Sequence, residues 1–311
     1  MPKILDGKIV RDEIMADLKK KIGDFTVMPN LAIIKIGDDP DSEIYVKNKI
    51  AFAKKIGVNA FIIDLSPKSD LEVGKRSDLA GHITQEMLLA GIEKLNEDES
   101  INGIIVQSPL PAPLNWQEAV EKVAPEKDVD GLCSVNIKKL LANDKTGIVP
   151  ATARGVLTLL NYYNIPVNGK KVVVMGRSLL VGKPIATVMT NNSATVTVVH
   201  SQTLEPEKIT READILIVAI GKPELVGADY VKEGQVVIDV GISSVNRPRH
   251  QNDTPSSSDE GVSLKPSVTV VGDVDFESVK DLVSAISPVP GGVGPMTVAS
   301  LFQNLVESVV R

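Results

Sequence analysis

The chain has 311 residues, of which 43% are hydrophobic and 24% charged, as in soluble globular proteins, and this length predicts two domains. The formal net charge of −6 disfavours nucleic acid as a main partner. A single cysteine excludes an internal disulfide, and the three histidines are too far apart in the sequence for a zinc motif, so we expect no metal.

The N-terminus gives no targeting signal. Its first ten residues, MPKILDGKIV, have no apolar core and include an early aspartate, which argues against a signal peptide and a transit peptide. The longest apolar runs, such as residues 215–220, are of strand length, whereas a membrane-spanning helix needs about 18 apolar residues. We therefore expect a cytoplasmic protein with no membrane partner.

The first half of the chain alternates helical and strand-like patterns. Apolar residues recur at helical spacing over residues 9–22, and a second helix is expected to begin at Asp39 and Pro40 and to end near Ile56. Strand-length apolar runs occupy residues 31–36, 60–63 and 103–106. This alternation is typical of an α/β domain, to which we assign residues 1–147.

A second alternation follows a polar, turn-rich segment at residues 125–150. It has strand-like runs at residues 171–175, 194–199, 214–220 and 236–240. We assign residues 148–290 to a second α/β domain, and a helix at 295–311, with a proline at its first position, completes the first domain. Residues 245–266 are polar and rich in proline and serine, which predicts an exposed, mobile loop, a tolerated insertion rather than a regulatory segment.

A glycine turn in the second domain is a candidate nucleotide site. In KKVVVMGRSLLVGKPIA, residues 170–186, a strand runs into Gly176 and a helical pattern follows Gly182. Free N–H groups at such a helix start bind a pyrophosphate, so nucleotide binding is favoured over a plain strand-to-helix turn, although the spacing departs from GxGxxG.

The cofactor that this turn favours is NADP. The next strand ends at His200 and Ser201, without the carboxylate that would hold the 2′-hydroxyl of NAD. Arg177 could pair with the 2′-phosphate of NADP. The alternative for this arginine is an ordinary position on the solvated surface.

A tyrosine and a lysine define a second candidate site. Ser42, Tyr45 and Lys49 lie on one side of the predicted second helix, beside its core-facing stripe. Partial loss of water would lower the pKa of Lys49 and suit it to carry a proton or to polarise water. In short-chain dehydrogenases a Tyr-x-x-x-Lys pair follows the cofactor turn in the same domain; here it precedes the turn and lies in the other domain. This order predicts a site assembled across a cleft, although the pair alone is explained more simply by a snorkelling lysine beside a half-buried tyrosine.

Two further segments could reach that cleft. The strand GIIVQSPLP at residues 103–111 ends in Gln107, and a side chain at the carboxyl end of a strand could orient the amine of Lys49. An ordinary polar residue at a strand end is the alternative. The proline- and glycine-rich turn at residues 287–297 either presses backbone against a flat ligand or only links the domains.

The acidic run EKDVDGL at residues 126–132 has the start of a calcium loop. Ile137 stands where the bidentate glutamate would be, so we reject calcium. A loop carboxylate such as Asp130 is suited to accept paired N–H donors from an aminopyrimidine-like ring. Turn capping by these aspartates is the alternative.

Five motifs together resemble those of the bifunctional methylenetetrahydrofolate dehydrogenase/methenyltetrahydrofolate cyclohydrolase family over nearly the whole chain. They are SxxYxxxK at 42–49, GIIVQxPLP at 103–111, PEKDVDG at 125–131, GRSxxVGxP at 176–184 and PVPGGVGPMT at 288–297. The resemblance implies two α/β domains flanking a cleft, the second a Rossmann-like NADP-binding domain. It also implies a homodimer that serves one-carbon metabolism and purine biosynthesis. The implied reactions are oxidation of 5,10-methylenetetrahydrofolate by NADP and hydrolysis of the methenyl product to 10-formyltetrahydrofolate.

The resemblance also implies roles for individual residues. Lys49 would be the central catalytic group, held by Gln107 and Ser42, while Tyr45 stacks on the folate and Asp130 holds its pterin ring. Further substrate contacts would come from Val106, Ser108, Pro288, Val289, Pro290, Gly291 and Gly292. Nucleotide contacts would come from Gly176, Arg177, Ser178, Ser201 and Ile242.

The chain departs from the family pattern in three places. PATA at 150–153 replaces the usual PCTP, Ser108 replaces a usual leucine, and residues 245–266 look like an extra loop. The first two touch the hinge and the folate wall, so they bear on affinity more than on the type of reaction.

Two alternatives stay open. One is a monofunctional NAD-dependent methylenetetrahydrofolate dehydrogenase, for which Arg177 and Ser201 are the discriminating residues. The other is a non-catalytic NADP-binding sensor, against which the presence of Lys49, Gln107 and Asp130 counts.

Overall fold

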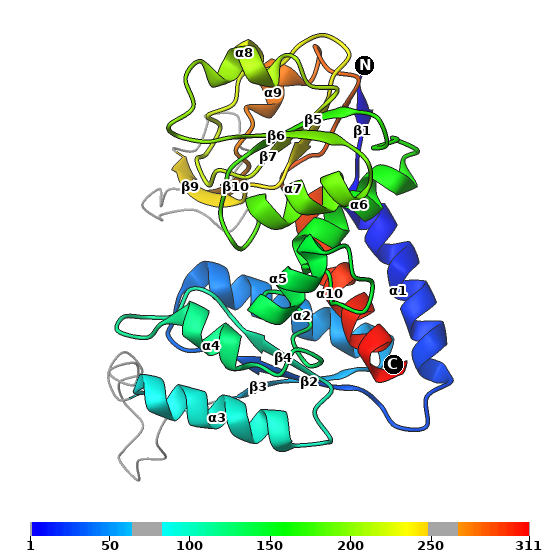
Figure 1. Ribbon diagram of the computed structural model, residues 1–311, viewed down its shortest axis with the longest axis vertical. Coiled ribbons are helices and arrows are strands. Elements are labelled where there is room, and N and C mark those ends of the chain that lie inside the picture. The colour runs from blue at the N-terminus through cyan, green and yellow to red at the C-terminus, as the bar shows by residue number, and fades with distance from the viewer. Residues whose placement is uncertain (1, 64–82, 248–266, 311) are drawn as a thin grey trace, which may run out of the picture.

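The computed structural model describes residues 2–63, 83–247 and 267–310. It has two lobes, of which the one with strands β2 to β4 lies at the bottom of Figure 1 and the one with strands β5 to β7 at the top. Each lobe is built on its own parallel sheet. The α/β fold class predicted from the sequence is confirmed. Within the described residues, no helix is long and apolar enough to cross a membrane.

The first lobe contains a parallel sheet in the order β3 (Asn59–Ile63), β2 (Asn30–Ile34) and β4 (Gly103–Val106). Its helices are α1 (Gly7–Gly23), α2 (Pro40–Ile56), α3 (Gln85–Glu97), α4 (Trp116–Lys122), α5 (Ser134–Leu141) and α10 (Val293–Val310). Alternate residues of β2 face opposite sides of the sheet. Leu31 and Ile33 join a core with α1, α2 and α10, whereas Ala32 and Ile34 join a core with α3 and α4. Because both faces are covered, β2 is a continuous apolar run.

Helix α2 begins and ends as its sequence predicts. The Asp39 carboxylate accepts the N–H of Ser42 at 2.7 Å, and Pro40 occupies the first turn. Gly57 ends the helix in the left-handed region, with φ 90°. These local signals fix the phase of the helix and so place Tyr45 and Lys49 toward the second lobe.

The described part of the second lobe has a six-stranded parallel sheet in the order β1-β11-β8-β7-β5-β6. Its strands are β1 (Lys3–Ile4), β5 (Lys171–Met175), β6 (Thr195–Val199), β7 (Ile215–Val218), β8 (Val236–Asp239) and β11 (Ala285–Ile286). Its helices are α6 (Ala151–Tyr162), α7 (Gly182–Asn191), α8 (Pro206–Thr210), α9 (Phe276–Val279) and a 3-10 turn at Ala228–Tyr230. The strand order reverses at β5, so the carboxyl end of β5 is a topological switch point, where such sheets bind ligands.

Helices α6 and α10 join the lobes and pack against each other (Figure 1). The guanidinium of Arg154 on α6 pairs in bidentate fashion with the carboxylate of Glu307 on α10, at 2.8 and 2.5 Å. On the other side of α10, Phe302 stacks on Phe52 of α2 with ring centroids 5.0 Å apart. The last helix is therefore anchored to both lobes.

Several sequence predictions are wrong in detail. Helix α5 lies in the segment predicted to be turn-rich, because contacts made by Asp128 and Asn136 stabilise it. Residues 245–247 belong to β9 (Ser243–Arg247), which pairs antiparallel with β10 (Ser267–Val271); the rest of the predicted loop, residues 248–266, lies outside the described residues. Helix α10 begins two residues before Pro295, which is its third residue rather than its first.

The N-terminal strand also differs from the predicted division into domains. Lys3 and Ile4 belong to the first domain in the predicted division, yet β1 pairs with β11 at the edge of the second lobe's sheet. A two-residue strand carries no sequence signal for its partner, so only the folded chain reveals it. The division at residues 147 and 148 stays a prediction.

Candidate active site

A cavity of about 390 Å³ lies between the carboxyl end of β4, helix α2 and the second lobe. It brings together residues that the sequence analysis took from distant segments. Those that line it are Tyr45, Lys49, Val106, Gln107, Ser108, Asp130 and Ile242. The predicted assembly of the site across a cleft is therefore observed in the geometry.

Lys49 is buried in this cavity, with 7% of its surface exposed. Its ammonium donates a hydrogen bond to Gln107 Oε1 at 3.1 Å, and Gln107 Nε2 donates to the carbonyl of Ser108 at 2.9 Å. The second bond fixes the amide so that its oxygen faces Lys49. Burial lowers the pKa of Lys49, while the negative charge of Asp130 acts in the opposite direction.

The two aspartates of the acidic run have different roles. Asp128 is buried and accepts the backbone N–H groups of Gly131 and Cys133, at 3.0 and 2.8 Å, and the side-chain amide of Asn136 at 3.0 Å. The turn-capping interpretation therefore fits Asp128. Asp130 instead lines the cavity with Lys49. Among the described residues, no group of three or more histidine, cysteine or acidic side chains could hold a metal ion.

A second cavity, of about 380 Å³, continues from the first past Tyr45. Both are lined by Tyr45, Val240, Ile242, Gly294 and Val298. The second cavity also contains residues 288–292, which we name the 288–292 loop, and not Lys49 or Gln107. The substrate contacts predicted for this loop therefore lie beyond Tyr45 and away from the buried amine.

The 288–292 loop is held against the start of helix α1. The N–H of Gly7 donates to the carbonyl of Gly291 at 2.9 Å. A Cβ atom at Gly7 would lie 1.9 Å from the carbonyl oxygen of Gly292, so only glycine permits this approach.

Three basic side chains of the second cavity were missed by the sequence analysis. Lys8 and Arg11 come from α1 and Lys55 from α2. In the sequence they look like ordinary surface residues, and only the packing of α1 against α2 brings them to one cavity. They place positive charge at this end of the cleft, although the guanidinium of Arg11 is paired with the Asp12 carboxylate at 2.7 Å.

The cofactor turn is tightly folded at the switch point. Gly176 has φ 116°, and a Cβ atom there would lie 2.0 Å from the carbonyl oxygen of Ala219, at the end of β7. A Cβ atom at Gly182 would lie 2.3 Å from the carbonyl oxygen of Gly176. The turn therefore has no room for a side chain at either position.

Ser178 caps the helix that follows this turn. Its hydroxyl oxygen accepts the N–H groups of Val181 and Gly182, at 3.1 and 3.2 Å. Arg177 beside it is exposed, as is Ser201 after β6.

Some predicted residues lie outside both cavities. Ser42 is buried on α2, and among the described residues it lines neither cavity. The same holds for Gly176, Arg177, Ser178 and Ser201, although Leu180 and Val181 of the same turn do reach the first cavity. The roles of these five residues stay predictions.

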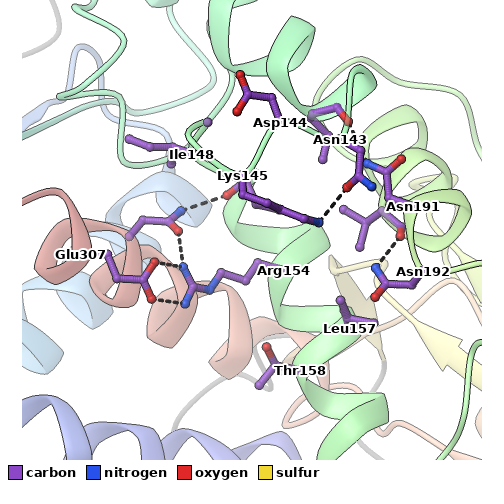
Figure 2. A pocket seen from close by; sticks show the side chains of 15 residues that line it. Asn143, Asp144, Lys145, Ile148, Arg154, Leu157, Thr158, Asn191, Asn192 and Glu307 are labelled. Carbon is purple, nitrogen blue, oxygen red and sulfur yellow. Dashed lines mark hydrogen bonds and ion pairs between the residues drawn. The ribbon is translucent and has the colours of Figure 1, made fainter. Parts of the chain in front are cut away.

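A third cavity, of about 370 Å³, lies between α6, α7 and the end of α10. Figure 2 shows the Arg154 guanidinium paired with Glu307 in it and the Lys145 ammonium directed at Asn143, with a hydrogen bond of 2.7 Å. None of the predicted site residues lines it. We therefore place the candidate active site in the cleft and not here.

A buried amine in a cleft that faces a Rossmann-like lobe is the arrangement of a two-domain, nucleotide-dependent enzyme. The family model for the catalytic domain of tetrahydrofolate dehydrogenase/cyclohydrolase matches residues 5–130, and the model for its NAD(P)-binding domain matches residues 150–311. This chain belongs to the tetrahydrofolate dehydrogenase/cyclohydrolase family.

Individual relatives agree over the whole length. The bifunctional protein FolD of Lacticaseibacillus paracasei is 43% identical over 305 residues, which cover 97% of this chain and 95% of that protein. The crystal structure of the bifunctional enzyme FolD from Campylobacter jejuni is 37% identical, with a TM-score of 0.84 and coverage of 100% and 99%. The Trypanosoma brucei FolD structure, complexed with NADP cofactor and inhibitor, is 35% identical, with a TM-score of 0.84 and full coverage of both chains.

Proposed function

We propose that this protein oxidises 5,10-methylenetetrahydrofolate with NADP and then hydrolyses the methenyl product to 10-formyltetrahydrofolate. The observation that carries the proposal is the buried amine of Lys49, hydrogen-bonded to Gln107 and sharing one cavity with Asp130 and Ile242. This cavity joins the catalytic lobe to the nucleotide lobe, so one site can serve both reactions.

The residues at the switch point fit a dinucleotide. Gly176 and Gly182 leave only backbone at the turn, so a pyrophosphate can approach it closely. Arg177 in this turn and Ser201 after β6 are exposed, and β6 is not directly followed by an acidic residue that would repel a 2′-phosphate. NADP is therefore the cofactor we propose, and when bound it supplies the acceptor for the hydride. A relative solved with NADP supports this choice.

Lys49 would act mainly in the hydrolysis. The methenyl substrate is a resonance-stabilised cation, and a water molecule attacks its bridging carbon. Since burial lowers the pKa of Lys49, a larger fraction of its amine is neutral and can accept the proton that the water loses. Gln107 holds the amine in place through its Oε1 atom. The carbon–nitrogen bond to N5 then breaks, N5 takes up a proton, and the formyl group stays on N10.

The two continuous cavities suit the shape of a folate. Its flat pterin ring would occupy the cavity with Lys49, and Asp130, which lines this cavity, would accept its N–H donors. Tyr45 lines both cavities and would stack on the middle of the molecule. The acidic end would then lie near Lys8, Arg11 and Lys55. The 288–292 loop would cover this part of the substrate.

The remaining sequence-based expectations are also proposals. We propose a cytoplasmic homodimer, in which residues 1–147 with the last helix bind folate and residues 148–290 bind NADP. Light scattering of the purified protein tests the dimer, because a monomer mass would contradict it.

A spectrophotometric assay with methylenetetrahydrofolate tests the proposed function. NADP should be reduced at the rate at which substrate is consumed, and methenyltetrahydrofolate supplied alone should be hydrolysed faster than in buffer. Turnover with NAD but not NADP, without hydrolysis, would favour the monofunctional enzyme. No turnover with either nucleotide would favour the sensor.

A further inference from the structure

Two buried aspartates lie where the chain enters and leaves the pair of antiparallel strands β9 and β10. Asp239 ends β8, before the hairpin, and Asp273 follows β10, after it; their exposed fractions are 3% and 0%. A Cβ atom at Gly272 would lie 1.9 Å from Asp239 Oδ2, and one at Gly241 would lie 2.2 Å from Asp273 Cγ. Each carboxylate therefore lies against a glycine of the other segment, and no larger residue fits at either glycine.

Asp239 holds the turn that carries Ile242. Its Oδ1 atom accepts the N–H groups of Gly241 and Asp273, at 3.0 and 3.1 Å, and its Oδ2 atom accepts the N–H of Val274 at 2.9 Å. Ile242 lines both cavities of the cleft. The position of the second lobe's contact with the active site thus depends on this carboxylate.

Asp273 holds the loop after β7. Its Oδ2 atom accepts the N–H groups of Ile220 and Gly221, at 2.7 and 2.9 Å, and its Oδ1 atom accepts the N–H of Lys222 at 2.8 Å. This loop begins beside Ala219, whose carbonyl oxygen abuts Gly176 of the cofactor turn. One carboxylate therefore fixes the strand end that borders the nucleotide turn.

The same cluster reaches the 288–292 loop through Ser287. The backbone N–H of Asp239 donates to Ser287 Oγ at 2.8 Å, and this hydroxyl donates back to the carbonyl of Asp239 at 3.3 Å. This contact uses the backbone of Asp239, so replacing its side chain leaves the partner atoms in place. The side chains of Asp239 and Asp273 themselves hold only segments of the second lobe.

We propose that Asp239 and Asp273 are positioning residues that hold the loops after β8 and β7 in the conformation that binds NADP. The inference rests on the proposed function. Lys49, Gln107 and Asp130 all come from the first lobe, and the loop after β7 lines neither cavity of the cleft. Loosening that loop should therefore weaken NADP binding and leave hydrolysis of methenyltetrahydrofolate intact. If the aspartates only stabilised the fold, their loss would lower NADP affinity and the hydrolysis rate together.

Asp273→Asn is the main test, because the amide keeps the shape of the carboxylate but one of its two acceptor atoms becomes a donor. The loss of a charge-assisted hydrogen bond predicts a dissociation constant for NADP, measured by calorimetry, that rises about ten- to a hundredfold. The rate of methenyltetrahydrofolate hydrolysis without NADP should stay at the wild-type value. Asp239→Asn should also weaken NADP binding, but because Asp239 lines the second cavity, the hydrolysis control applies to Asp273→Asn alone.

Asp275→Asn is the matched control. Asp275 caps α9 by accepting the N–H of Ser278 at 3.3 Å and bonds to neither loop through its side chain in the described structure, and asparagine caps equally well. Both measurements should stay at the wild-type value in this variant.

Unchanged NADP affinity in Asp273→Asn and Asp239→Asn would overturn the proposal. So would parallel losses of NADP affinity and hydrolysis in Asp273→Asn, or an unfolded protein for both variants. The calorimetric titration does not need turnover, so a wild-type protein that binds NADP but converts no folate would refute the proposed function and still test this inference.

Discussion

Replacement of Arg177 by alanine should separate the two nicotinamide cofactors. Arg177 follows Gly176 at the switch point, is exposed, and makes no ion pair with any described residue, so its guanidinium is available to a ligand. NADP carries a 2′-phosphate and NAD does not. The change should therefore weaken NADP and leave NAD almost unaffected.

The size of the effect follows from the exposure of the side chain. A hydrogen bond to a charged group contributes about 1.5–3 kcal/mol, and exposed ion pairs contribute about 0.2–1 kcal/mol. A bidentate contact at an exposed position should fall between these, at about 1–2.5 kcal/mol. Since 1.36 kcal/mol is a factor of ten, the KM for NADP should rise about 5- to 70-fold.

Steady-state oxidation of methylenetetrahydrofolate with each cofactor measures this selectivity. Arg211→Ala is a matched control, because Arg211 is exposed on the same lobe but lies between α8 and the start of β7, at the amino end of the strands, whereas Arg177 follows the carboxyl end of β5. The effect at Arg177 should shrink as salt is added, since screening weakens an exposed contact. Equal losses for NADP and NAD, or an equal loss in Arg211→Ala, would refute the 2′-phosphate contact.

Three further outcomes are expected. Burial lowers the pKa of Lys49, so the hydrolysis rate should rise with pH, and the midpoint of this rise should lie below 10.5. The negative charge of Asp130 raises the pKa of Lys49, so Asp130→Asn should move the midpoint of the pH–rate profile to lower pH. A higher midpoint in this variant would contradict the assignment. Gly176→Ala should lower the free energy of unfolding by about 2–5 kcal/mol, because the backbone has a positive φ and the new Cβ atom overlaps the carbonyl oxygen of Ala219. Gly169→Ala should cost only about 1–2 kcal/mol, because Gly169 has a positive φ but no atom near its Cβ position. Equal losses in denaturant titrations would contradict the close contact at Gly176. Lys55→Ala should raise the KM for the folate substrate up to about fivefold without changing kcat, and the same rise in Lys54→Ala, outside the cavity, would count against an acidic substrate end there.

Local signals were sufficient for much of the fold. Asp39 and Pro40 marked the start of α2, its predicted end near Ile56 is observed, and its phase then placed Lys49 beside buried surface. Strands β4 and β5 have the predicted bounds because buried parallel strands are continuous apolar runs. The pairing of β9 with β10 could not be predicted, because the partners are separated by residues 248–266 and the sequence of β9, SSVNR, is too polar to be distinguished from a loop.

The candidate site was likewise only partly predictable from the sequence. The contact between Lys49 and Gln107 was predictable, because a helix face and the carboxyl end of a neighbouring strand meet in α/β folds. The capping of α7 by Ser178 was not, since its hydroxyl could equally have faced a ligand. The buried Asp239 and Asp273 depend on contacts between segments far apart in the chain, and nothing local distinguishes them from surface aspartates.

The hydrolysis of methenyltetrahydrofolate by Lys49→Ala tests the central claim most directly. If the buried amine accepts the proton from water, the rate should fall about 100- to 10,000-fold, while the dissociation constant for NADP stays at the wild-type value. Hydrolysis at the wild-type rate by a folded Lys49→Ala protein would contradict the account.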